Sequence, residues 1–111
     1  MGSRAKKGEW KFDEKAAGLH ASTALWLKER DVAVLGSDGS ADVLPSGCEG
    51  QTHPIHQLVL IGLGMPILDN LNLEDLAKVA NDQNRWEFLI VVAPMRIIGG
   101  TGSPVNPIAT F

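Results

Sequence analysis

Two histidines and an aspartate frame the longest apolar run of the sequence, at residues 58–68. His53 and His56 precede this run, and Asp69 follows it directly. Imidazole nitrogens and carboxylate oxygens are common ligands of Zn²⁺ and of other divalent cations. His56 and Asp69 are therefore the candidate metal ligands, and His53 is a candidate pocket residue that could add a third group. A catalytic metal normally takes about three protein ligands, so the pair alone is one ligand short.

The surrounding residues predict a buried helix followed by a buried strand. Thr52 is a suitable N-cap, and Pro54 suits the first helical turn, where its missing N–H would have no partner anyway. The apolar side chains at 58–61 leave no polar face, which predicts that this helix is buried on all sides. Residues 65–68 predict a short strand. The histidine ligand should thus lie at the helix start, and the aspartate at the strand exit.

Two further polar side chains, Asp38 and His20, are candidate pocket residues. An unbroken apolar run at 32–36 predicts a strand covered on both faces, as is typical of parallel sheets. Asp38 follows that strand at its carboxyl end, where α/β sheets commonly bind ligands. The alternative is that Asp38 hydrogen-bonds the backbone of its own turn. His20 lies in the first turn of a helix predicted over 18–30, and its alternative is a surface or capping histidine.

The remaining pattern completes an α/β chain. A long loop at 40–51 precedes the apolar segment, and a helix is predicted at 73–81. The clearest strand, at 86–93, is rich in β-branched and aromatic residues, and residues 95–98 would continue it. A last strand is predicted at 105–111. This order predicts a small mixed β-sheet packed with two to three helices.

Composition limits the class of protein. The 111 residues suffice for one domain, and ten Lys and Arg against thirteen Asp and Glu give a net charge of −3. That balance argues against nucleic-acid and anionic-membrane partners, since both require a basic surface. Cys48 is the only cysteine, which excludes an intramolecular disulfide and favours a reducing compartment. The start of the sequence has no secretory signal, and the apolar run is too short to cross a bilayer, so we expect a cytoplasmic protein.

The N-terminal segment differs from the rest. Residues 1–15 are polar and mixed in charge, with Trp10 and Phe12 as the only large apolar side chains. They predict a polar arm whose two aromatic rings contact the body of the protein.

A series of short pieces recurs in the order found in one known family. The pieces are Gly18-Leu19-His20, Trp26-Leu27, residues 30–33 and 36–39, His56, Gly64, Asp69, Leu73-Glu74, Leu76, Trp86-Glu87-Phe88, Ala93-Pro94 and residues 99–107. Together they resemble the metal-dependent cyclase family, which includes bacterial kynurenine formamidase. The ordered set, with its Gly-Ser-Pro-Val-Asn-Pro ending, is the specific part of this resemblance.

The resemblance implies a truncated cyclase-like (swivelling β/α) half-domain at residues 16–111. Members of the family bind a divalent metal largely through a His-x-Gly-Thr-His-x-Asp motif in their first half, and this sequence lacks that motif. His56 matches a later histidine of the family site. Asp69 matches a glutamate and is one methylene shorter. The chain thus looks like the carboxy-terminal half of a family member that begins at its own Met1, as a truncated gene product, a mobile remnant or one half of a split protein.

We therefore expect a domain that does not catalyse a reaction on its own. It should self-associate as a homo-oligomer, because the missing half would leave apolar surface exposed, and it could bind a small ligand or partner. No cofactor is expected or, if one is bound, a divalent metal such as Zn or Mn. His56 would then hydrogen-bond a backbone carbonyl, and Asp69 would cap the turn near Asn70 and Asn72.

The alternative is a metal-dependent hydrolase of linear amides or esters. Its site would be completed by oligomerisation or by a separate N-terminal cyclase half.

Overall fold

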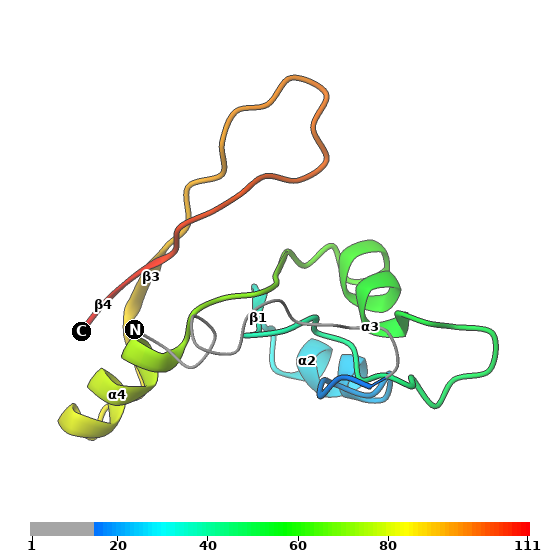
Figure 1. Ribbon diagram of the computed structural model, residues 1–111, viewed down its shortest axis with the longest axis horizontal. Coiled ribbons are helices and arrows are strands. Elements are labelled where there is room, and N and C mark those ends of the chain that lie inside the picture. The colour runs from blue at the N-terminus through cyan, green and yellow to red at the C-terminus, as the bar shows by residue number, and fades with distance from the viewer. Residues whose placement is uncertain (1–14) are drawn as a thin grey trace. The chain divides into compact units, whose positions relative to one another are not determined.

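The computed structural model describes residues 15–111, which fall into two compact units (Figure 1). The first unit ends at Leu73 and the second comprises Glu74–Phe111; each is described by itself. Apart from Lys15, the predicted N-terminal arm, with Trp10 and Phe12, lies outside the described residues. The expected α/β class is confirmed. The assignment of residues 16–111 to one cyclase-like half-domain stays a prediction.

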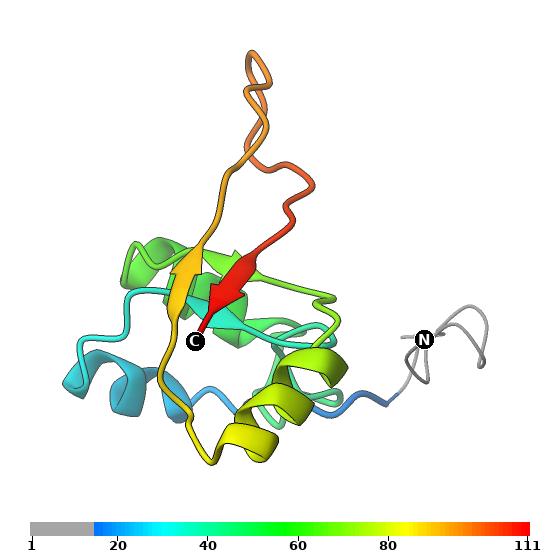
Figure 2. The ribbon, with the colours of Figure 1, turned by 90° about the vertical axis from the view of Figure 1, so that its left-hand side faces the viewer.

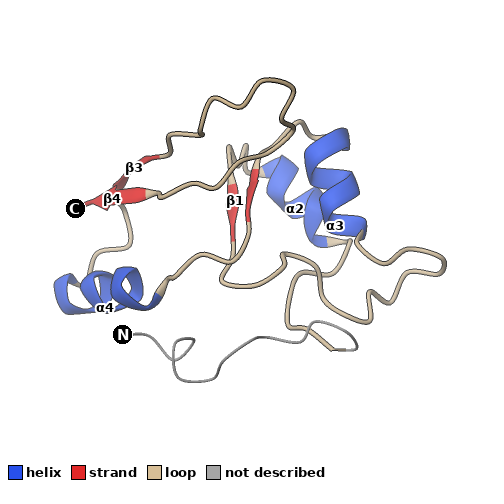
Figure 3. Cartoon of the chain, turned by 45° about the horizontal axis from the view of Figure 1, so that its top comes forward, coloured by secondary structure: helices blue, strands red, loops and turns tan. Residues whose placement is uncertain are grey.

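The first unit interleaves helices with two strands, and the second is one helix followed by two strands (Figure 3). The first unit contains α2 (Thr23–Glu29), β1 (Leu35–Gly36), α3 (Pro54–His56), the π-helix η1 (Gln57–Gly62) and β2 (Ile67–Leu68). The second contains α4 (Glu74–Gln83), β3 (Leu89–Val91) and β4 (Ile108–Thr110). None of the helices in the described part of the chain is both long and apolar enough to cross a membrane.

The strands form two separate pairs, where the sequence predicted one mixed sheet. β1 and β2 are parallel, with Leu35 opposite Ile67. The N–H of Ser37 continues this ladder by donating to the carbonyl of Leu68 at 3.0 Å. β3 and β4 are antiparallel. Only the last two residues of the predicted strand at 32–36 belong to β1, because only these two pair with β2.

The core of the first unit gathers around α2, α3 and η1. Its buried side chains are Leu27, Ala41, Ile55, Val59 and Met65, and half-buried aliphatic residues surround them. The segment at 41–44 contributes to this core, although the sequence places it in a long loop. Bridges between Leu19 and Asp42 and between Ala16 and Leu44 hold that segment in place.

Gly18 allows residues 16–19 and the 41–44 segment to approach each other closely. A Cβ atom at this position would collide with the backbone carbonyl of Asp42. The bridges also explain why α2 begins at Thr23, several residues later than predicted, because residues 16–19 are extended against the 41–44 segment. Asp31, with φ of 50°, follows the end of α2, as the sequence predicted.

The prediction that the helix after Pro54 is buried on all sides is wrong. Ile55 and Val59 are fully buried, but Leu58, Leu60 and Ile61 are exposed, and Ile61 is 83% exposed. The backbone changes from α-helix to π-helix at Gln57, which alters the face that each later side chain occupies.

The second unit consists of a helix and a long hairpin. Glu74 and Asp75 lie in the first turn of α4, where the helix dipole favours acidic side chains. β3 and β4 lie side by side, and the chain between them extends well beyond the strands (Figure 2). The predicted strand at 86–93 is reduced to three residues, and the predicted continuation at 95–98 is not a strand.

Candidate functional site

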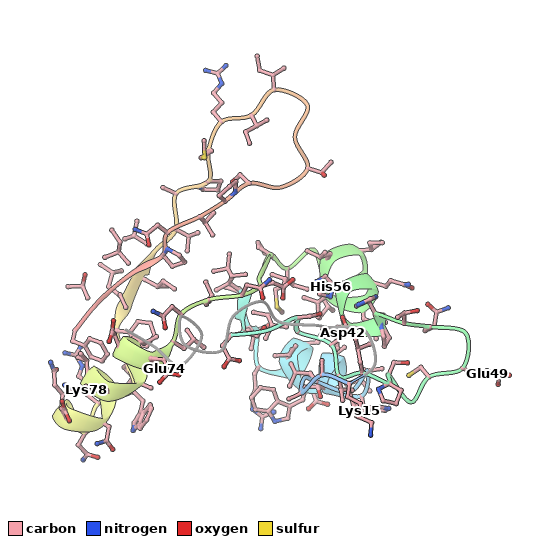
Figure 4. The ribbon with its side chains drawn as sticks, in the orientation of Figure 1. Lys15, Asp42, Glu49, His56, Glu74 and Lys78 are labelled. Carbon is pink, nitrogen blue, oxygen red and sulfur yellow. The ribbon has the colours of Figure 1, made fainter. Side chains whose placement is uncertain are left out.

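The Asp42 side chain is fully buried and accepts hydrogen bonds from the start of α3. The N–H of Ile55 donates to Oδ1 at 2.6 Å, and the N–H of His56 donates to Oδ2 at 3.3 Å. The ring nitrogen Nδ1 of His56 lies 2.5 Å from the same Oδ2. Figure 4 shows Asp42 and His56 next to each other. Both oxygens of this buried carboxylate therefore have partners, as burial requires.

Local sequence explains why α3 needs this distant acceptor. The helix begins with Pro54, so the next two N–H groups are the first that lack a helical partner. The N-cap position is occupied by His53 rather than by the predicted Thr52, and its side chain makes no capping hydrogen bond. Asp42 therefore performs the capping role from another segment, and its negative charge suits the positive end of the helix dipole.

Asp69 closes the cluster from the other side of the His56 ring. Its Oδ2 lies 2.8 Å from Nε2 of His56, and its Oδ1 accepts the N–H of Ala41 at 3.0 Å. The ring is thus held between two carboxylates. Both ring nitrogens of His56 face carboxylates rather than the backbone carbonyl that the sequence suggested, and Asp69 accepts a backbone N–H of the 41–44 segment. We call Asp42, His56 and Asp69 the carboxylate–histidine cluster.

The environment of His56 favours its charged form. Burial of the ring is the largest single influence and lowers the pKa, but the hydrogen bonds to Asp42 and Asp69, with their charges, outweigh it. The net effect raises the pKa of His56 above its ordinary value of 6.5. Since both ring nitrogens face carboxylate oxygens, only the doubly protonated ring donates a hydrogen bond to each.

The other predicted site residues lie outside this cluster. His53 is exposed, and its ring stands edge-on to that of His56 with 6.0 Å between centroids. His20 is also exposed; its Nδ1 lies 3.0 Å from the Ser22 hydroxyl and accepts the Ser22 N–H, directly before α2. Asp38 is exposed, and the hydroxyl of Ser37 donates to the turn backbone in its place. The structure thus brings together His56 and Asp69 but neither His20 nor Asp38.

Asp42 is the residue that sequence reasoning missed. It was assigned to an unstructured loop, and nothing within a few residues of it marks it as a capping group. The available signal was an acid between the apolar residues Ala41 and Val43. That pattern does not identify the helix that the acid caps.

The described residues do not fit a three-ligand metal centre within one chain. They contain no group of three or more His, Cys, Asp or Glu side chains arranged to hold a metal ion. Asp42 binds the opposite ring nitrogen, so at most His56 Nε2 and Asp69 converge on one point.

Comparisons with protein-family models, curated proteins and solved structures find no match. The likeness to the cyclase family therefore rests on the short pieces of sequence given above.

The Asp42→Ala substitution should lower the free energy of unfolding by about 2–4 kcal/mol. It removes the acceptor of two helix N–H groups and leaves His56 without its buried partner. Urea denaturation of variant and wild type measures this difference. Asp38→Ala is the matched control, an exposed aspartate of the same region, and should cost less than about 0.5 kcal/mol. Equal losses in the two variants would contradict the capping role of Asp42.

The His56 contribution to stability should depend on pH. Because the folded chain binds this proton more tightly than the unfolded chain, the contribution is complete below pH 6.5 and is lost as the pH rises through the higher folded-state pKa. The free energy of unfolding, measured in urea from acid to mildly alkaline pH, should fall less steeply in His56→Gln than in wild type. His20→Gln, at an exposed histidine outside the cluster, is the matched control variant. Parallel curves for His56→Gln and wild type would rule out the two-carboxylate contact.

Proposed function

We propose that this chain is an assembly domain, an α/β domain that does not catalyse a reaction alone and that self-associates through apolar surface. One observation carries the proposal. The described residues bury only four large aliphatic side chains, Leu27, Ile55, Val59 and Met65, but expose fourteen large apolar ones. Apolar surface of this extent is typical of proteins that bind a partner.

The carboxylate–histidine cluster supports a non-catalytic role. A general base needs a ring nitrogen free to accept a substrate proton. Both nitrogens of His56 are already bonded to carboxylates, and these contacts join α3, the 41–44 segment and the end of β2. A cluster that connects three segments in this way has a structural role that does not require a substrate.

The likeness to the cyclase family agrees with this proposal. A domain that corresponds to the carboxy-terminal half of a larger fold would expose the surface that the other half covers. A homo-oligomer is the simplest way to remove this surface from water.

Static light scattering after size-exclusion chromatography should give a dimeric or higher mass at micromolar concentration. The mass should not fall in 1 M NaCl, because apolar contacts are not screened by salt as charge pairs are. A mass of one chain at all concentrations would contradict the proposal. Dissociation by salt would indicate that charged groups hold the assembly together.

A metal-dependent hydrolase of amides or esters, completed by a second chain, is the other candidate. One observation favours it. Nε2 of His56 and Oδ2 of Asp69 lie 2.8 Å apart, while Nδ1 is held by a carboxylate, as is usual for metal-binding histidines. The further ligands would come from another copy or from a separate N-terminal half.

Under this second proposal, Zn²⁺ or Mn²⁺ should raise the melting temperature of the assembled protein. Free metal at 100 times its Kd stabilises a site by about 2.7 kcal/mol, which is about 10 °C or more for a domain of this size. His56→Ala should abolish the shift, and His20→Ala, at an exposed histidine outside the cluster, should retain it. Equal shifts in His56→Ala and wild type would exclude the cluster as the metal site.

A further inference from the structure

The second unit has almost no core of its own. Among residues 74–111, Ala80 is the only buried residue. Phe88 and Phe111 contact each other, with 5.4 Å between ring centroids, but both are only half-buried. A two-stranded hairpin is marginally stable in water unless an apolar face is covered. The hairpin of this unit therefore needs a covering surface.

One face of the β3–β4 pair carries three of the four exposed aliphatic side chains of these two strands. Val91 lies opposite Ile108, and Leu89 lies opposite Thr110, and cross-strand partners share a face. Leu89, Val91 and Ile108 are 67%, 53% and 57% exposed. We call these three residues the hairpin face. Ile90 points to the other side, because side chains alternate along a strand, and it is 40% exposed.

The charge of this segment restricts the partner. Residues 88–111 contain a single charged side chain, Arg96. A nucleic acid or an anionic membrane requires a basic surface, and one arginine does not provide it. In a symmetric dimer each patch faces a copy of itself, so a charged patch would repel its partner. An almost uncharged apolar patch is free of this repulsion.

We propose that a second copy of this chain packs on the hairpin face, the two hairpins lying face to face about a two-fold axis. This inference rests on the self-association proposed above and names the surface that performs it. Pairing of the strand edges would leave Leu89, Val91 and Ile108 in water. Face-to-face packing removes all three from water in both copies, as it does between the sheets of a sandwich.

The available apolar area suits such a dimer. Met95, Ile97 and Ile98 lie in the loop of the same hairpin and are 60%, 48% and 96% exposed. With the hairpin face they amount to about four complete side chains, or roughly 400 Å² of apolar surface per copy at about 100 Å² each. A stable interface buries about 800 Å² per partner, of which roughly 450–500 Å² is apolar. The strands and the loop of the hairpin together therefore supply most of this apolar area, and the hairpin face alone supplies less than half of it.

Two threonine substitutions in β3 test the proposal with little change in strand propensity. Val91→Thr lies on the hairpin face, and Ile90→Thr lies on the opposite face of the same strand. Since a two-fold interface contains each substitution twice, Val91→Thr should weaken the dimer Kd at least tenfold. Ile90→Thr should change it less than threefold. Sedimentation velocity over a concentration series measures both, and circular dichroism verifies that both variants remain folded.

Each outcome decides a different point. Equal Kd values for wild type, Val91→Thr and Ile90→Thr would contradict the hairpin face as the dimer interface. The proposal that the chain self-associates would still stand. In that case Ile61→Thr, at the most exposed apolar side chain of the first unit, should dissociate the assembly. A wild-type chain that stays monomeric would instead overturn self-association itself. Should Val91→Thr prove unfolded, Ile108→Thr on the neighbouring strand provides the same comparison.

Discussion

The burial of one carboxylate determines how the first unit is arranged. A buried carboxylate is costly unless its oxygens are hydrogen-bonded, and the partners of Asp42 are two helix N–H groups and the His56 ring. His56 in turn contacts Asp69, and Asp69 accepts the N–H of Ala41, the neighbour of Asp42. These contacts connect α3, the end of β2 and the 41–44 segment to one another in a closed ring. Removal of any member leaves another buried or half-buried polar group without its partner.

Local signals in the sequence located several ends of elements. Pro54 marked the start of α3, Asp31 marked the end of α2, and the last two residues of the strand predicted at 65–68 form β2. These features depend on a few neighbouring residues, which the sequence displays directly. The α/β class and the proximity of His56 to Asp69 at the ends of their elements followed from the same signals.

Long-range contacts account for what the sequence did not predict. The bridge between Leu19 and Asp42 joins residues far apart in sequence, so no local pattern announces it. The bridge positions Asp42 at the start of α3. From the sequence alone, where the bridge cannot be seen, this capping acid resembles an ordinary loop residue. The exposed side of η1 was missed for another reason. A continuous apolar run has no periodicity that distinguishes the face in the core from the face in water.

The same ambiguity affects the second unit. The residues at 86–93 predict a strand by composition, and all three residues of β3 are exposed. A composition rich in β-branched residues indicates a strand with an apolar face. It does not indicate whether the surface that covers this face belongs to the same chain. Val and Ile are common both in cores and in obligate interfaces, because such an interface resembles a domain core divided in two. Their presence therefore does not distinguish a core strand from an interface strand.

The two candidate functions place their partners on different units. A chain that completes a metal site must supply ligands at the carboxylate–histidine cluster, which lies in the first unit. A copy that covers the hairpin face needs only apolar side chains of the second unit. Apolar contact requires little more than complementary shape, whereas a metal centre requires a third donor at a defined distance from His56 and Asp69. Under the proposals above, an assembly domain has to meet only the first of these requirements, whereas an enzyme would need another polypeptide to meet the second.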